Sequence, residues 1–178
     1  MLRLFAAIAI PWDIAQGLAA HQTGFNGARW RTAEQLHITL RFVGDTPETR
    51  ADDLDAELSA IAIEPFDLQL AGVGHFGEPQ DIHAIWAGVA ENAALTRLQK
   101  RCESAARRAG IAADTRLYRP HVTLAYLKRP DPGAVMDWEA ANNLLRSPAF
   151  TVKRFGLYST HQTRDGSAYR LEGDYPLR

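Results

Sequence analysis

Two short segments of the chain repeat one arrangement of side chains that could carry chemistry. Residues 37–40 read HITL and residues 121–124 read HVTL, so each gives His, an apolar residue, Thr and Leu, and the two histidines lie 84 positions apart. With 6 His, 11 Thr and 19 Leu in 178 residues, composition alone predicts about 0.04 such tetrapeptides. The repeat therefore indicates a function shared by the two segments.

The alternation of side chains along a β-strand shows what each segment can present. Successive side chains of a strand point to opposite faces, so His37 and Thr39 would share one face while the apolar residues between and after them anchor the strand in the core. The same holds for His121 and Thr123. Each motif thus offers one imidazole together with one hydroxyl.

Two imidazoles in one groove favour general acid-base catalysis. Histidine titrates near neutrality, so one imidazole can accept a proton while the other donates one. Displacement at phosphorus requires both transfers, together with fixed donors for the non-bridging oxygens. Thr39 and Thr123 are suitable donors. The residues alone do not distinguish the acid from the base, because the two motifs are nearly equivalent.

The elements around the motifs predict an α+β fold with mainly antiparallel sheet. Turn signals follow both motifs, as GDTPE and KRPDPG, and Asp165-Gly166 predicts a turn between two strand-like runs. We expect one helix near residues 12–20, one capped by Asp45 or Thr46, one near 135–145, and one over 93–110 that ends at Gly110. Because each half carries one motif, we expect a bilobal molecule: two pseudo-twofold-related sheets with flanking helices and a central cleft.

Bulk properties bound the class of protein. The 178 residues predict one two-lobed domain over 1–178. A net charge of −1 argues against non-specific binding to nucleic acid.

The single Cys102, on an apolar helical stripe, is read as a buried thiol in a reducing compartment. We read the apolar run at residues 4–10 as a buried strand rather than a signal sequence. No apolar run approaches the roughly 18 residues of a membrane span, so we expect a cytoplasmic monomer without membrane contact or obligate protein partner.

Several longer segments resemble one known family. LHITLRFVGD and RPHVTLAYL, with RLFAAIAIP, AIWAGV and YRLEGDYPL, are similar to bacterial RNA 2′,3′-cyclic phosphodiesterases, also known as 2′-5′ RNA ligases, of the two-histidine phosphoesterase superfamily. The resemblance covers nearly the whole chain. It implies a bilobal fold, no metal or other cofactor, and hydrolysis of an RNA-terminal or nucleoside 2′,3′-cyclic phosphate to a 2′-phosphate. On this chain, His37 is then the proton donor to the departing 3′ oxygen and His121 the acceptor that activates water.

One residue departs from the pattern of the family. Many members have an arginine five positions after the second histidine, where it can contact phosphate, and this chain has Tyr126. A phenol donates one hydrogen bond but carries no positive charge. We therefore name Arg41, Lys128 and Arg129 as candidates for the missing cation, with Arg41 and Tyr126 as substrate-binding residues beside the two threonines.

Other chemistry-bearing residues are given structural interpretations. A lone histidine is more often structural than catalytic, which we apply to His21, His75, His83 and His161. Neither motif has a second metal ligand at helical or hairpin spacing, so no metal site is predicted. Phe5, Phe42, Trp30 and Tyr118 could stack on a base, and core packing is at least as good an account of each.

Three other functions remain open. The same chemistry run with a ribose hydroxyl in place of water would be reversible 2′-5′ ligation of RNA. A module that binds RNA ends without turnover, and a phosphodiesterase for another small cyclic phosphate, also fit the motifs. A joined product from defined RNA fragments would indicate ligation, and a nucleoside 2′,3′-cyclic phosphate left unchanged would indicate a binding module. A panel of substrates would identify a phosphodiesterase for another cyclic phosphate.

Overall fold

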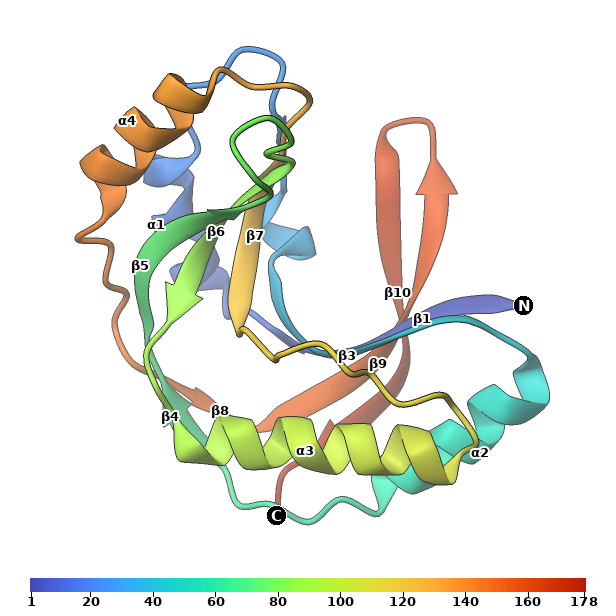
Figure 1. The fold of residues 1–178 in the computed structure, drawn as a ribbon. Coiled ribbons are helices and arrows are strands. Elements are labelled where there is room, and N and C mark those ends of the chain that lie inside the picture. Colours follow the sequence, from blue (N-terminus) through green and yellow to red (C-terminus); the bar gives the residue numbers. More distant parts are fainter.

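The chain folds into ten strands and four α-helices, and the computed structural model describes all 178 residues (Figure 1). The strands are β1 Leu2–Ala9, β2 Arg29–Trp30, β3 His37–Thr46, β4 Phe66–Leu68, β5 Leu70–Phe76, β6 Ala84–Val89, β7 His121–Tyr126, β8 Phe150–Val152, β9 Arg154–Thr163 and β10 Gly166–Pro176. The helices are α1 Trp12–Leu18, α2 Glu48–Ser59, α3 Ala93–Arg108 and α4 Pro132–Asn142, with short 3-10 turns at Ala19–His21 and Ala33–Gln35. The predicted α+β class is confirmed.

Eight strands form one antiparallel sheet, and β4 pairs separately with β8. The order is β10-β9-β1-β3-β7-β6-β5, and β2 pairs with β7 beyond this path. The two motif strands β3 and β7 are neighbours joined at a single residue pair, Ile38 with Val122. One half of the sheet holds β10, β9, β1 and β3, and the other holds β7, β6, β5 and β2. The two halves were expected as separate sheets, but hydrogen bonds join them into one.

That single pair brings the two motifs together. Ile38 and Val122 are both 0% exposed and belong to the core, as the apolar positions of both motifs were expected to do. In an antiparallel pair with this register, His37 falls opposite Thr123 and Thr39 opposite His121, on the face away from the core. Because no further pair forms on either side, the two halves of the sheet diverge from this point.

Helices cover the sheet on the side away from the motif histidines. α2 and α3 lie together beneath the half that holds β3, β9 and β10, and α4 lies beside β5 (Figure 1). The predicted stripe of α3 is confirmed, with Cys102 0% exposed, and Gly110 follows the helix end with a φ of 76°. The Asn92 side chain caps α3 by accepting a hydrogen bond from the Leu95 amide.

The expected cap of α2 is wrong. β3 continues through Thr46, whose hydroxyl donates to the Gly44 carbonyl, and the residue before the helix is Pro47, which has no capping side chain. The turn expected at Asp165-Gly166 is confirmed: it joins β9 to β10 in a hairpin whose tip projects from its half of the sheet (Figure 1). None of the helices has the length and apolar composition needed to cross a membrane.

Candidate active site

The two motifs open into one cleft of about 500 Å³. His37, Thr39, His121, Thr123 and Tyr126 all line it, so five of the six predicted site residues come together from β3 and β7. The pairing of Ile38 with Val122 explains this, because it fixes both histidines on one face of adjacent strands.

Both imidazoles are held by the same local hydrogen bond. Nδ1 of His37 lies 2.7 Å from the Gln35 carbonyl oxygen, and Nδ1 of His121 lies 2.7 Å from the Arg119 carbonyl oxygen. A carbonyl only accepts, so each Nδ1 carries a proton, and in the neutral ring Nε2 is left as an acceptor. The two rings are thus fixed with Nε2 available for proton transfer.

The Gln35 carbonyl that orients His37 is itself anchored. The Gln35 side chain accepts a hydrogen bond from the Thr32 amide at 3.0 Å and donates to the Ser167 carbonyl of β10 at 2.6 Å. These bonds connect the 3-10 turn before β3 to the β9–β10 hairpin. The orientation of His37 therefore depends on contacts across the cleft, which local sequence does not display.

Aromatic rings wall both histidines. The His37 ring centroid lies 4.9 Å from that of Phe5 and 5.2 Å from that of Tyr169. The His121 ring lies edge-on to Phe76 at 4.6 Å, with Trp86 at 6.2 Å. Phe5 belongs to β1 and Phe76 to β5, so the rings come from strands on either side of the two motif strands. Removal of water by these rings disfavours a charged imidazole.

The pKa values of both histidines are accordingly lowered. Burial lowers the pKa of His37 from 6.5 to about 4, and the nearby charges of Arg31 and His121 act in the same direction, while the Gln35 carbonyl opposes them. Burial also lowers the pKa of His121 from 6.5, against the effect of the Arg119 carbonyl. Both rings are therefore mainly neutral at pH 7, and an anion between them would raise both pKa values.

This arrangement predicts an acid-shifted pH dependence. If His121 accepts a proton it must be neutral, so kcat/KM rises as pH increases through its pKa; if His37 donates one, kcat/KM falls as pH increases through a pKa of about 4. The maximum of kcat/KM is expected below pH 6.5, the ordinary value for histidine. The alkaline limb of kcat should lie at higher pH, because bound phosphate raises the pKa of His37.

Rate measurements across pH 4 to pH 9 check this prediction. A flat profile from pH 5 to pH 9 would contradict proton transfer by this pair of histidines. Superimposable profiles of kcat and kcat/KM would contradict the expected effect of bound phosphate on the pKa of His37.

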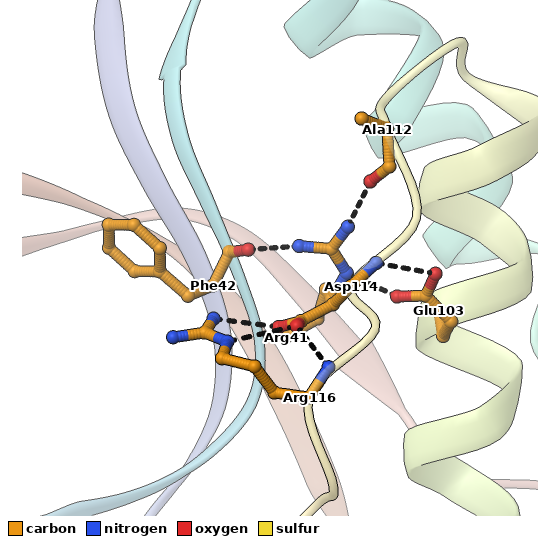
Figure 2. A network of polar contacts seen from close by, with 6 residues as sticks. All are labelled: Arg41, Phe42, Glu103, Ala112, Asp114 and Arg116. Atoms are coloured by element: carbon orange, nitrogen blue, oxygen red, sulfur yellow. Dashed lines mark hydrogen bonds and ion pairs between the residues drawn. The ribbon is translucent and has the colours of Figure 1, made fainter.

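Arg41, the remaining predicted site residue, does not reach the cleft. Its side chain is 6% exposed, forms an ion pair with Glu103, and donates to the carbonyl oxygens of Phe42 and Ala112 (Figure 2). The prediction that Arg41 binds substrate is therefore wrong. Its guanidinium instead ties β3 to α3 and to the segment that follows the helix.

A β-bulge explains this outcome. β1 pairs Ala6 with Arg41 and Ala7 with Thr39, which leaves Leu40 without a partner. The extra residue shifts the alternation, so Arg41 turns to the helix side and Phe42 takes the place in the cleft. Strict alternation from His37 would place Arg41 on the cleft face and Phe42 on the opposite face.

Lys128 and Arg129, the other two candidate cations, also lie outside the cleft. Both are exposed in the turn after β7, and neither is among the lining residues. Of the four candidate aromatic residues, Phe5 and Phe42 line the cleft. Trp30 packs near Phe25, and the Tyr118 hydroxyl donates to the Thr39 carbonyl. His21, His75, His83 and His161 all lie outside the cleft.

The cleft also contains arginines that the sequence interpretation missed. Arg3, Arg29 and Arg31 line it, and no aspartate or glutamate does. Three cations without a carboxylate favour an anionic ligand. The one local signal was the alternation Arg29, Trp30, Arg31, which places both arginines on one face of an extended segment. The partner strand of that segment could not be read from the sequence.

Known proteins resemble this chain over nearly its whole length. The family model described as the 2′-5′ RNA ligase superfamily matches residues 10–164. A Geobacillus stearothermophilus protein named RNA 2′,3′-cyclic phosphodiesterase is 33% identical over 150 residues, which cover 81% of this chain and 48% of that protein. The chain thus spans about half the length of that relative.

Two further matches cover both partners almost completely. A Methanocaldococcus jannaschii protein, also named RNA 2′,3′-cyclic phosphodiesterase, is 30% identical over 174 residues, covering 96% of this chain and 98% of that one. The crystal structure of the protein TT0787 of Thermus thermophilus superposes with a TM-score of 0.81 at 25% identity, over 99% of this chain and 98% of the other. The similarity in sequence and the similarity in fold therefore each cover nearly the whole chain.

Proposed function

Since the chain belongs to the 2′-5′ RNA ligase superfamily, we propose that it hydrolyses 2′,3′-cyclic phosphates, on RNA ends or nucleosides, to 2′-phosphates. The observation that carries the proposal is one cleft in which two imidazoles are fixed with Nε2 available and no carboxylate is present. Relatives named RNA 2′,3′-cyclic phosphodiesterase, two of them at 30% and 33% identity, support the choice of substrate.

The proposed reaction assigns one proton transfer to each motif. Nε2 of His121 accepts a proton from water as the water oxygen attacks phosphorus. The bond between phosphorus and the 3′ oxygen breaks, and His37, protonated once the phosphate anion is bound, gives its proton to that oxygen. Thr39 and Thr123 donate hydrogen bonds to the non-bridging oxygens. No further group is needed for proton balance.

We also propose that the chain acts as one domain over residues 1–178, as a cytoplasmic monomer without cofactor or obligate protein partner. Its only cysteine is a buried free thiol, which fits a reducing compartment. Size-exclusion chromatography with light scattering checks the oligomeric state.

The product identifies the reaction. Incubation of the protein with cytidine 2′,3′-cyclic phosphate in excess EDTA is expected to give cytidine 2′-phosphate, because the 3′ oxygen departs and the two imidazoles supply the proton transfers. Phosphorus NMR separates the 2′-phosphate from the 3′-phosphate. Heat-denatured protein is the control.

Three results would contradict the proposal in different ways. A 3′-phosphate product would mean that the substrate binds in the opposite orientation. Turnover that stops in EDTA and returns with a divalent cation would replace the metal-free mechanism. Binding without turnover would leave an RNA-end binding module.

The description of the matching family favours one alternative, 2′-5′ ligation. Ligation uses the same two proton transfers with a ribose hydroxyl in place of water. An RNA fragment ending in a 2′,3′-cyclic phosphate, mixed with a second fragment bearing a 5′ hydroxyl, distinguishes the two reactions. A joined product indicates ligation, and an unjoined first fragment that now ends in a 2′-phosphate indicates hydrolysis.

A further inference from the structure

Two arginines are buried in this chain, and they differ in their partners. Arg41 and Arg31 are each 6% exposed. Arg41 is paired with Glu103. None of the ion pairs of the structure involves Arg31, and its side chain lines the cleft that holds both motif histidines. Arg31 is therefore a buried cation without a carboxylate, at the site of proposed chemistry.

The contacts of Arg31 hold its guanidinium without neutralising it. Nη2 donates to the Tyr169 hydroxyl at 2.6 Å, and Cζ lies 5.3 Å from the centre of the Tyr126 ring and 5.6 Å from that of Tyr169. The ring faces attract a cation, but they accept few of its N–H groups. A guanidinium has five N–H donors in a rigid planar fork. Donors therefore remain for an anion that enters the cleft.

Strand pairing places this cation beside the second motif. The Arg31 amide donates to the Leu124 carbonyl at 2.9 Å, and β2 pairs Arg29 with Tyr126. The positive charge of Arg31 also contributes to the lowered pKa of His37, so the guanidinium acts on the first motif as well. An anion between the two histidines would lie within the field of Arg31.

We propose that Arg31 binds the non-bridging oxygens of the reacting phosphate, with Tyr126 and Tyr169 holding its guanidinium in place. A planar guanidinium fits two oxygens of one phosphate, and a buried cation gains most from a charge that it can neutralise. Tyr126 stands where members of the family often have an arginine, and in this role it supports an arginine that directly follows the adjacent strand β2. This assignment rests on the proposed phosphoesterase function.

The test removes the guanidinium at position 31 and then returns one from position 126 on β7. Arg31→Met is expected to lower kcat/KM for cytidine 2′,3′-cyclic phosphate by about 10²- to 10³-fold, and to raise the inhibition constant of inorganic phosphate by about tenfold or more. Arg31→Met with Tyr126→Arg should recover at least about tenfold of the lost kcat/KM, because it returns a guanidinium to the same cleft from β7. Arg170→Met, which removes a 73% exposed arginine next to Tyr169 in sequence, is the matched control and should match wild type.

A second measurement separates phosphate binding from a structural role. Removal of the Arg31 charge should raise the pKa of His37, because that charge disfavours the protonated ring. NMR titration of the His37 ring follows this, and thermal unfolding shows whether Arg31→Met and Arg31→Lys remain folded. If Arg31→Met unfolds, Arg31→Lys, which keeps the charge but loses the planar fork, is expected to fold and to lose part of kcat/KM and phosphate binding.

The outcomes distinguish this proposal from the proposed function. Folded Arg31→Met, or Arg31→Lys if only that variant folds, with wild-type kcat/KM and wild-type phosphate inhibition overturns the role of Arg31 and leaves the hydrolase intact. If wild-type protein hydrolyses no cyclic phosphate, the proposed function fails, and phosphate titration by NMR still decides the matter: weaker binding in the variant supports Arg31 as an anion ligand, and equal binding overturns it.

Discussion

His37→Ala and His121→Ala are each expected to lower kcat by about 10²- to 10⁴-fold while the protein stays folded. Each change removes one proton-transfer group from the cleft, and the only hydrogen bond lost with each ring is the one from Nδ1 to a carbonyl two residues earlier. Steady-state kinetics with a nucleoside 2′,3′-cyclic phosphate gives kcat, and circular dichroism with thermal unfolding shows that the fold persists.

The double variant tests whether the two imidazoles act in one step. Groups that work as a unit are not additive, so the double variant should lose less than the product of the two single losses. His83→Ala is the matched control, because His83 is exposed and lies outside the cleft. A single variant that keeps wild-type kcat, or a control that loses as much as the motif variants, would rule out this assignment.

Arg41→Met is expected to lower the free energy of unfolding by about 3 to 5 kcal/mol, the effect of removing one partner of a buried ion pair. The Arg41 side chain is 6% exposed and the Glu103 side chain 19%. The substitution leaves the Glu103 carboxylate without its cation and the Phe42 and Ala112 carbonyls without a donor (Figure 2). Urea denaturation measures the loss, and kcat of the folded fraction should change little because Arg41 lies outside the cleft.

Arg116→Met is the control within the same region of Figure 2. Arg116 is 74% exposed and pairs with Asp114 at 2.7 Å. Exposed ion pairs contribute about 0 to 1 kcal/mol, so this variant should retain nearly all of the stability. Normal stability of Arg41→Met combined with a loss of kcat would instead indicate that Arg41 acts at the substrate site, as predicted from the sequence.

Local patterns in the sequence determined the elements that carry the site. The alternation of His37 and Thr39 with buried Ile38 and Leu40 is a property of any strand, so the face that holds the imidazole and hydroxyl was readable. The apolar spacing on α3 fixed the burial of Cys102 in the same way. Each of these features depends on residues a few positions apart, which a linear sequence displays directly.

The tertiary structure decided which cations face the cleft. Arg41 lies outside the cleft because the pairing of β3 with β1 contains a bulge at Leu40. Arg31 lines the cleft because β2, which precedes it, pairs with β7. Both events depend on hydrogen bonds between strands distant in the chain, and no local pattern records which strand will pair with which, or where one extra residue will be accommodated.

The acidity of the histidines was also decided by the fold. Phe5 on β1, Phe76 on β5 and Trp86 on β6 exclude water from the two rings, and the charge of Arg31 reaches His37 across the cleft. The sequence by itself determined that two imidazoles and two hydroxyls are presented in matching pairs. Only the tertiary structure decided their pKa values and the guanidinium beside them, because solvent exclusion and electrostatic interaction act between atoms that folding brings close, whatever their separation along the chain.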